Sequence, residues 1–289
     1  MKRIVFDIDG DRLVGDLHLP DGDGPHPAVV MAGPMTSVKE QVTGTYAAAL
    51  ANQGFAALSI DHRHFGESEG TPRQYEFYEH KIEDLRAALD VLGNQSEVDA
   101  RRIGAVGVCL GSGYLAHAIN ERSDVKALVA VAGYFRDVEA LKAADPDDFP
   151  RKVDQGRHAR ERYERAGVVE MIPAVALDRD AAMTMETTYD YYARRATHPN
   201  YTNELAVMSR EHFLSFDVQS AAPEVAVPVL MVHGLNALNP DWADKFFSAV
   251  RSTKSRATIC SKGQTDIYDD PIIVKQVTSL AAEFLSQHL

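Results

Sequence analysis

Cysteine is scarce in this chain of 289 residues, which has only Cys109 and Cys260. Two cysteines do not make a disulfide framework, and without His or Cys at ligand spacing they do not indicate a zinc site. We therefore expect neither a metal nor a cofactor. A reducing cytoplasm is the expected location, because a free thiol stays available for chemistry there.

Long apolar runs are missing as well. No stretch approaches the roughly 20 residues that span a bilayer, and Asp7 interrupts the first residues before the apolar core of a signal peptide can form. The formal net charge is -12, which repels phosphate backbones. We expect a small-molecule substrate as partner, with no nucleic acid and no membrane; a homodimer is left open.

Short apolar strands alternate with helices along most of the chain. Strands are expected at 3–8, 13–19, 27–31, 55–60, 103–108, 127–132, 228–232 and 257–260, and helices at 41–53, 77–92, about 111–120, about 240–250 and 272–289. This alternation is typical of a mostly parallel sheet covered by helices on both faces, which is an α/β fold. Within it, Cys260 is expected to pack in the core of a late strand.

The alternation stops between about residues 136 and 224, where the sequence is charged and carries an aromatic cluster. We interpret this stretch as a cap or lid inserted into a core made of residues 1–135 and 225–289. The aromatic side chains could line an acyl pocket, although a small core within the insertion is the favoured alternative.

The residues that indicate chemistry are Gly107-Val108-Cys109-Leu110-Gly111, between a strand and a helix. Small residues two before and two after Cys109 fit a nucleophile elbow, and Ser112 lacks such neighbours. The following helix N-terminus predicts a Cys109 pKa below the free value of about 8.5. A small, inert, buried cysteine is the alternative.

This elbow resembles that of the dienelactone-hydrolase-related branch of the α/β-hydrolases, which uses Cys. Residues 29–40 are similar to the strand and oxyanion loop of that branch, and 61–68 to its Asp-x-Arg…Gly-x-Ser loop. Residues 191–203 resemble the insertion of a subgroup that includes enzymes moving or hydrolysing polyketide acyl groups. The resemblance implies an α/β-hydrolase fold with a helical cap.

The same resemblance implies roles for individual residues. Cys109 would be the nucleophile, and the oxyanion would be held by the backbone N–H groups of Leu110 and Met35, with Thr36 as the next choice after Met35. Further substrate-binding candidates share a position near the active edge of the sheet or in the insertion. They are Thr36, His62, His64, Tyr134 and His198. For the three histidines, a purely structural role in their loops is the favoured alternative.

The branch pattern fails at its general base, since the loop 261–270 contains no histidine. Gln264 stands at the expected position; it cannot accept a proton near neutral pH, but it can orient a substrate. The expected acid is also missing after His233-Gly234, where Leu235 follows. His233 is a substitute base candidate, although a packed core histidine is the favoured interpretation.

Two hypotheses about function follow. In the first, an acyl–Cys109 intermediate forms from an ester, lactone or thioester, and water or a second nucleophile accepts the acyl group, which makes the protein a hydrolase, thioesterase or acyltransferase. In the second, the triad is degenerate and the protein binds a small molecule or catalyses a non-hydrolytic lyase or cyclase step. The first is favoured because a thiolate can react without a base.

Overall fold

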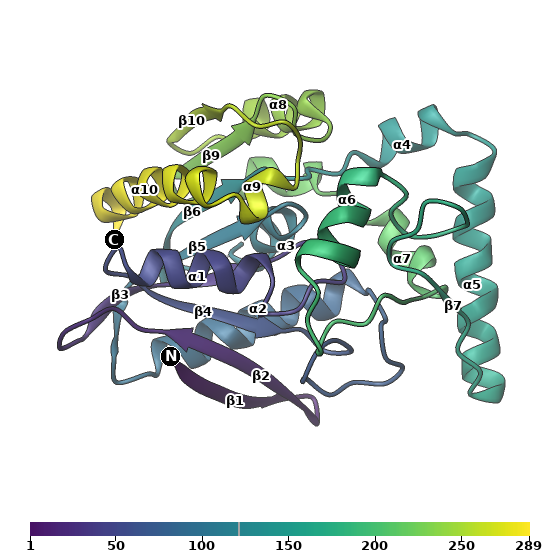
Figure 1. Ribbon diagram of the computed structural model, residues 1–289, viewed down its shortest axis with the longest axis horizontal. Helices are drawn as coiled ribbons and strands as arrows, with labels where there is room; N and C mark the ends of the chain where they lie inside the picture. The colour runs from purple at the N-terminus through teal and green to yellow at the C-terminus, as the bar shows by residue number, and fades with distance from the viewer. Residues whose placement is uncertain (121) are drawn as a thin grey trace.

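An eight-stranded sheet forms the centre of the computed structural model, which describes residues 1–120 and 122–289 (Figure 1). The strand order is β1-β2-β4-β3-β5-β6-β9-β10. The strands are β1 (Lys2–Ile8), β2 (Asp11–His18), β3 (His26–Ala32), β4 (Ala56–Asp61), β5 (Val98–Val108), β6 (Val125–Val131), β9 (Val229–Gly234) and β10 (Lys254–Ile259). β2 is antiparallel to β1 and β4, and the other neighbours are parallel. The expected mostly parallel α/β sheet is confirmed.

Helices cover both faces of this sheet. One face carries α1 (Val42–Ala51), α9 (Asp266–Asp269) and α10 (Pro271–His288), and the other carries α2 (Tyr78–Gly93), α3 (Gly111–Ala118) and α8 (Pro240–Ala249). Successive residues of a strand point to opposite faces, so Val29 and Val30 enter different apolar cores. Burial on both faces explains the unbroken apolar strands in the sequence.

Residues 136–224 contribute no strand to the eight-stranded sheet. Their elements are α4 (Val138–Ala144), α5 (Asp148–Ala166), β7 (Met171–Ile172), α6 (Glu186–Asp190), η1 (Tyr191–Arg195), β8 (Leu205–Ala206), α7 (Ser209–Ser215) and η2 (Gln219–Glu224). β7 and β8 form a separate antiparallel pair. Helices α4 to α7 gather at one end of the sheet (Figure 1). Along the described chain, no helix combines the length and apolar character needed to cross a bilayer.

The expected burial of Cys260 is wrong. Strand β10 ends at Ile259, and Cys260 is exposed immediately after it. β10 is the last strand of the sheet and pairs only with β9, so it is less covered than the central strands. An edge position of this kind cannot be read from the residue types of one strand alone.

The junction between β5 and α3 depends on glycine at position 111. A Cβ atom there would lie 2.2 Å from the carbonyl oxygen of Ala32 in β3, closer than two atoms can approach. We predict that Gly111→Ala lowers the free energy of unfolding by about 3 kcal/mol in urea denaturation, because backbone must move to relieve the overlap.

Gly263→Ala is the matched control, since its added Cβ would meet only the Thr187 Cγ2 atom, at 3.7 Å. Equal stability of the two variants would contradict the close approach of α3 to the end of β3.

Candidate active site

Cys109 occupies a tight turn between β5 and α3. Its φ angle is 57°, in the left-handed region that residues with a side chain rarely adopt. The turn is held on both sides: the Cys109 N–H donates to the Val131 carbonyl, and the Tyr134 N–H donates to the Cys109 carbonyl, each at 3.0 Å. A Cβ at Gly107 would lie 2.5 Å from the Ser112 Cα. The small flanking residues are therefore a steric requirement of the turn, as the elbow hypothesis expects.

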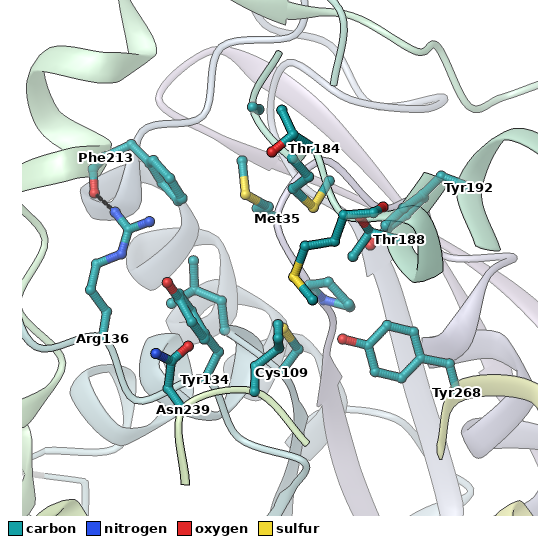
Figure 2. Close-up of a pocket in the computed structure, with 16 residues that line it drawn as sticks. Met35, Cys109, Tyr134, Arg136, Thr184, Thr188, Tyr192, Phe213, Asn239 and Tyr268 are labelled. Atoms are coloured by element: carbon teal, nitrogen blue, oxygen red, sulfur yellow. Dashed lines mark hydrogen bonds between the residues drawn. The ribbon is translucent and has the colours of Figure 1, made fainter. Parts of the chain in front are cut away.

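A cavity of about 250 Å³ opens beside Cys109 (Figure 2). The lining comes from the loops at the end of the sheet and from the 136–224 insertion. Its members are Pro34, Met35, Cys109, Leu110, Tyr134, Arg136, Ala182, Met183, Thr184, Met185, Thr188, Tyr192, Phe213, Leu238, Asn239 and Tyr268. Within the described chain this lining includes no histidine and no carboxylate, so the cavity wall offers no ordinary general base.

The predicted depression of the Cys109 pKa is wrong. Burial raises the pKa of the Cys109 thiol above its ordinary value, and hydrogen bonding by the Tyr268 hydroxyl, the Leu110 N–H and the Gln264 amide reverses only part of the shift. Loss of bulk water around the sulfur is the largest cause, and the positive charge of Arg136 opposes it together with these hydrogen bonds. The sulfur is therefore mainly a neutral thiol at pH 7.

Gln264 is committed to protein partners and does not line the cavity. Its Nε2 donates to the Ala132 carbonyl at 2.7 Å and to the Tyr268 hydroxyl at 3.2 Å, and its Oε1 accepts from the Leu238 N–H at 3.0 Å. The side chain predicted to orient a substrate instead positions Tyr268, which lines the cavity next to Cys109. Sequence reasoning missed Tyr268. The signal that could have found it is that Tyr268 follows Gln264 by four residues at the start of α9, a spacing that places two side chains on the same side of a helix.

The oxyanion role of Leu110 and Met35 stays a prediction, and the structure places both residues at the cavity. Leu110 and Met35 both line the cavity, and the Leu110 N–H also interacts with the Cys109 sulfur. Thr36, the next choice, is wrong because its N–H donates to the Glu76 carboxylate at 2.9 Å. Thr36 is buried and outside the cavity lining, so its predicted contact with substrate also fails.

Glu76 joins the loop that carries Thr36 to α3, the helix that follows Cys109. Its carboxylate is fully buried and accepts from the Thr36 N–H, from the Tyr114 hydroxyl at 2.6 Å and from Lys81 at 2.9 Å. Tyr114 belongs to α3, so one carboxylate fixes both sides of the site. Sequence reasoning missed Glu76, because its partners at 36 and 114 lie far away along the chain and no local motif marks it.

Of the remaining substrate-binding candidates, only Tyr134 lines the cavity. His62 is buried against Asp84, with its Nδ1 3.2 Å from a carboxylate oxygen. His64 pairs with His80, their ring nitrogens 2.9 Å apart. These two histidines hold the loop after β4 in place, so their predicted contact with substrate is wrong.

His198 also fails as a substrate-binding candidate. It lies in the insertion, with its Nδ1 3.8 Å from a Glu40 carboxylate oxygen, and it does not line the cavity. The insertion approaches the core through this segment: the Asn200 Nδ2 donates to Glu40 at 2.7 Å. The segment therefore serves to join the insertion to the core.

His233 cannot act as the substitute base. The side chain is buried in β9, outside the cavity lining, and neither ring nitrogen has a hydrogen-bond partner in the described structure. Burial, together with the positive charge of Arg256, lowers the pKa of His233 to about 4. It is a neutral core residue, which is the alternative that the sequence favoured.

The sheet order, the elbow after β5 and the cavity over it define an α/β-hydrolase. Residues 28–271 match the family described as serine aminopeptidase, S33, and the chain belongs to this family of α/β-hydrolase enzymes. Membership of the α/β-hydrolase superfamily is thus confirmed. Ser112 is not the elbow residue: it is fully buried, and its hydroxyl donates to the Gly107 carbonyl at 2.9 Å.

Individual relatives agree with this class. The chain is 30% identical over 272 residues to the uncharacterized protein YcjY of Escherichia coli K12, covering 91% of this chain and 89% of that one. It resembles the crystal structure of the hypothetical protein PA2218 from Pseudomonas aeruginosa, with a TM-score of 0.85 at 26% identity over 100% and 93% of the chains. A shorter match, 41% identical over 101 residues, is to thiohydrolase AneE of Aspergillus aculeatus, covering 35% and 31%. The chain is therefore a hydrolase-type enzyme.

The buried His233 has a consequence for acid stability. The folded-state pKa of His233, about 4, lies below the unfolded value of about 6.5, so between these pH values the unfolded chain binds a proton that the folded protein does not. The free energy of unfolding is therefore at its full value above about pH 6.5 and decreases as the pH falls towards about 4. We predict that His233→Leu reduces the loss of unfolding free energy between pH 7.5 and pH 5 by about 2 kcal/mol.

The exposed His158→Leu variant is the control for this measurement. Urea unfolding at the two pH values gives the comparison, and a His233→Leu protein as acid-sensitive as the parent would contradict the burial of a neutral imidazole.

Proposed function

We propose that this enzyme transfers acyl groups through Cys109, which takes the acyl group from a small-molecule ester, lactone or thioester. One observation carries the proposal: a cysteine occupies the left-handed elbow position and lines the cavity together with Leu110 and Met35. The 136–224 insertion acts in this proposal as a lid, because Met183, Thr188 and other side chains from it line the cavity.

The proposed acylation step conserves atoms and charge without a general base. The Cys109 sulfur forms a bond to the acyl carbon, and the N–H groups of Leu110 and Met35 stabilise the tetrahedral oxyanion. The bond from the acyl carbon to the leaving oxygen or sulfur then breaks, and the thiol proton ends on the leaving group. A thioester suits this site best, because its leaving thiolate is similar in basicity to the attacking one.

The missing base also affects which molecule accepts the acyl group from Cys109. Water is a weak nucleophile unless a neighbouring group removes its proton, and the described cavity lining holds no histidine or carboxylate. We infer that a thiol or amine accepts the acyl group faster than water does. The local similarity to a thiohydrolase supports a thioester as donor, and a reducing cytoplasm remains the proposed location because it keeps the thiol free.

A second candidate function is favoured by the raised pKa of Cys109. If the thiol stays neutral throughout, the cavity binds its ligand and promotes a lyase or cyclase step without a covalent intermediate. The two candidates differ in whether turnover needs the sulfur atom.

Removal of the sulfur separates the two. We predict that Cys109→Ala slows the release of thiophenol from S-phenyl thiobutyrate on the order of 100-fold or more, because the nucleophile is lost. Cys260→Ala removes the exposed thiol and serves as the matched control, with unchanged release expected. Undiminished turnover by Cys109→Ala would reject the acyl-transfer proposal in favour of the second candidate.

The pH dependence of alkylation tests the state of the thiol. Since burial raises the pKa of Cys109, the thiolate fraction should rise about tenfold per pH unit between pH 6 and pH 8. In the Cys260→Ala background, we predict that the rate of reaction with iodoacetamide follows this rise without a plateau. A plateau beginning near pH 6.5 would reveal a thiolate stabilised by a positive partner and contradict this account.

A further inference from the structure

Arg136 brings a buried positive charge into the cavity. It follows β6 at the start of the insertion and is only 5% exposed. One guanidinium nitrogen, Nη1, donates to the Phe213 carbonyl, and the guanidinium carbon lies 3.7 Å above the centre of the Phe213 ring. Figure 2 shows the guanidinium on one side of the view and Tyr268 on the other, with Cys109 between them.

The charge of Arg136 has no carboxylate partner in the described structure. Its Nε is buried without any hydrogen-bond partner. Glu76, a carboxylate whose charge acts on it, already accepts from Tyr114 and Lys81. A buried cation without a counter-ion is costly, and burial accordingly lowers the pKa of Arg136. A bound anion would neutralise the charge of Arg136.

We propose that Arg136 binds a carboxylate on the substrate, so that the enzyme acts on acyl groups that end in a second carboxyl, such as half-thioesters of dicarboxylic acids. The inference rests on the proposed function and names its substrate class. A planar guanidinium can hold a carboxylate through two parallel N–H···O bonds. Nη1 is engaged by the Phe213 carbonyl, and Nε has no hydrogen-bond partner in the described structure, so the edge formed by Nε and Nη2 is the one proposed for this contact. The Tyr134 hydroxyl also interacts with the guanidinium and would share it with the carboxylate.

The charge balance favours a carboxylate over a phosphate. Arg136 is the single charged side chain among the described lining residues apart from the ionisable thiol and phenols. A carboxylate would neutralise it, whereas a phosphate dianion would leave an uncompensated negative charge in an enclosed space. Neutral donors such as the Tyr134 hydroxyl and the Asn239 amide also line the cavity, and they can complete the hydrogen bonding of a monoanion.

Binding is tested first without chemistry, in the Cys109→Ala protein. Calorimetry compares monomethyl glutarate with its isosteric amide, methyl 4-carbamoylbutanoate. We expect the acid to bind about tenfold or more tightly, because only the acid pairs with the guanidinium. Arg136→Met should abolish this preference, and Arg136→Lys should retain part of it. Equal affinities of the two ligands for the protein that keeps Arg136 would overturn the proposal.

Two further measurements test whether the site prefers carboxylate to phosphate, and whether a loss of binding comes from the loss of Arg136 or from misfolding. Inorganic phosphate should not displace monomethyl glutarate. If phosphate displaces it at a phosphate concentration below that of monomethyl glutarate, the carboxylate assignment is overturned. Because Arg136→Met also loses the bond to Phe213, its circular dichroism is compared with that of Arg136→Lys. A preference for the acid that persists in a folded Arg136→Met protein would equally contradict the role of this residue.

Failure of this inference can be told from failure of the proposed function. With Cys109 present, acylation by S-phenyl thiobutyrate is compared with acylation by the S-phenyl half-thioester of glutaric acid. If Arg136 does not bind carboxylates, both donors acylate Cys109 with similar efficiency. If Cys109 is not the nucleophile, neither acylates it, while the acid still binds better than the amide.

Discussion

The left-handed backbone at Cys109 is the constraint on which the site depends. A side chain in this conformation costs on the order of 1 kcal/mol or more, and it persists only where the surrounding structure fixes it. Here the turn is tied to neighbouring backbone at Val131 and Tyr134, and Gly107 and Gly111 leave no room for any side chain. As a result, the sulfur and the Leu110 N–H meet at the floor of the same cavity.

The electrostatics of that cavity set the reactivity of the thiol. Without a histidine or carboxylate in the described cavity lining, the Cys109 sulfur stays mainly protonated, and the proposed reaction would proceed through a small thiolate fraction. Gln264, the residue that the sequence places at the position expected for a histidine, uses its amide to position Tyr268. The Tyr268 phenol remains neutral because burial raises its pKa well above the ordinary value. In the proposed function, such a site would suit activated acyl donors, because a good leaving group offsets the weak activation of the thiol.

The sequence predicted the features that depend on local spacing and missed those that depend on distant contacts. The sheet and the elbow at Cys109 follow from strand periodicity and the glycine positions around one turn. The Cys109 pKa could not be predicted, since the helix N-terminus is local whereas the burial comes from the insertion and from the loop bearing Tyr268. Glu76 and Arg136 were missed for the same reason: the bond from Arg136 to the Phe213 carbonyl spans 77 positions.

Formation of an acyl–sulfur bond at Cys109 is the most direct test of the proposed function. Wild-type protein mixed briefly with S-phenyl thiobutyrate at mildly alkaline pH, quenched in acid and analysed by intact-mass and peptide mass spectrometry, should gain one butyryl group. The account predicts that the group maps to the peptide containing Cys109. Release of thiophenol with no acyl group on that peptide, or with the group on Cys260 alone, would contradict it.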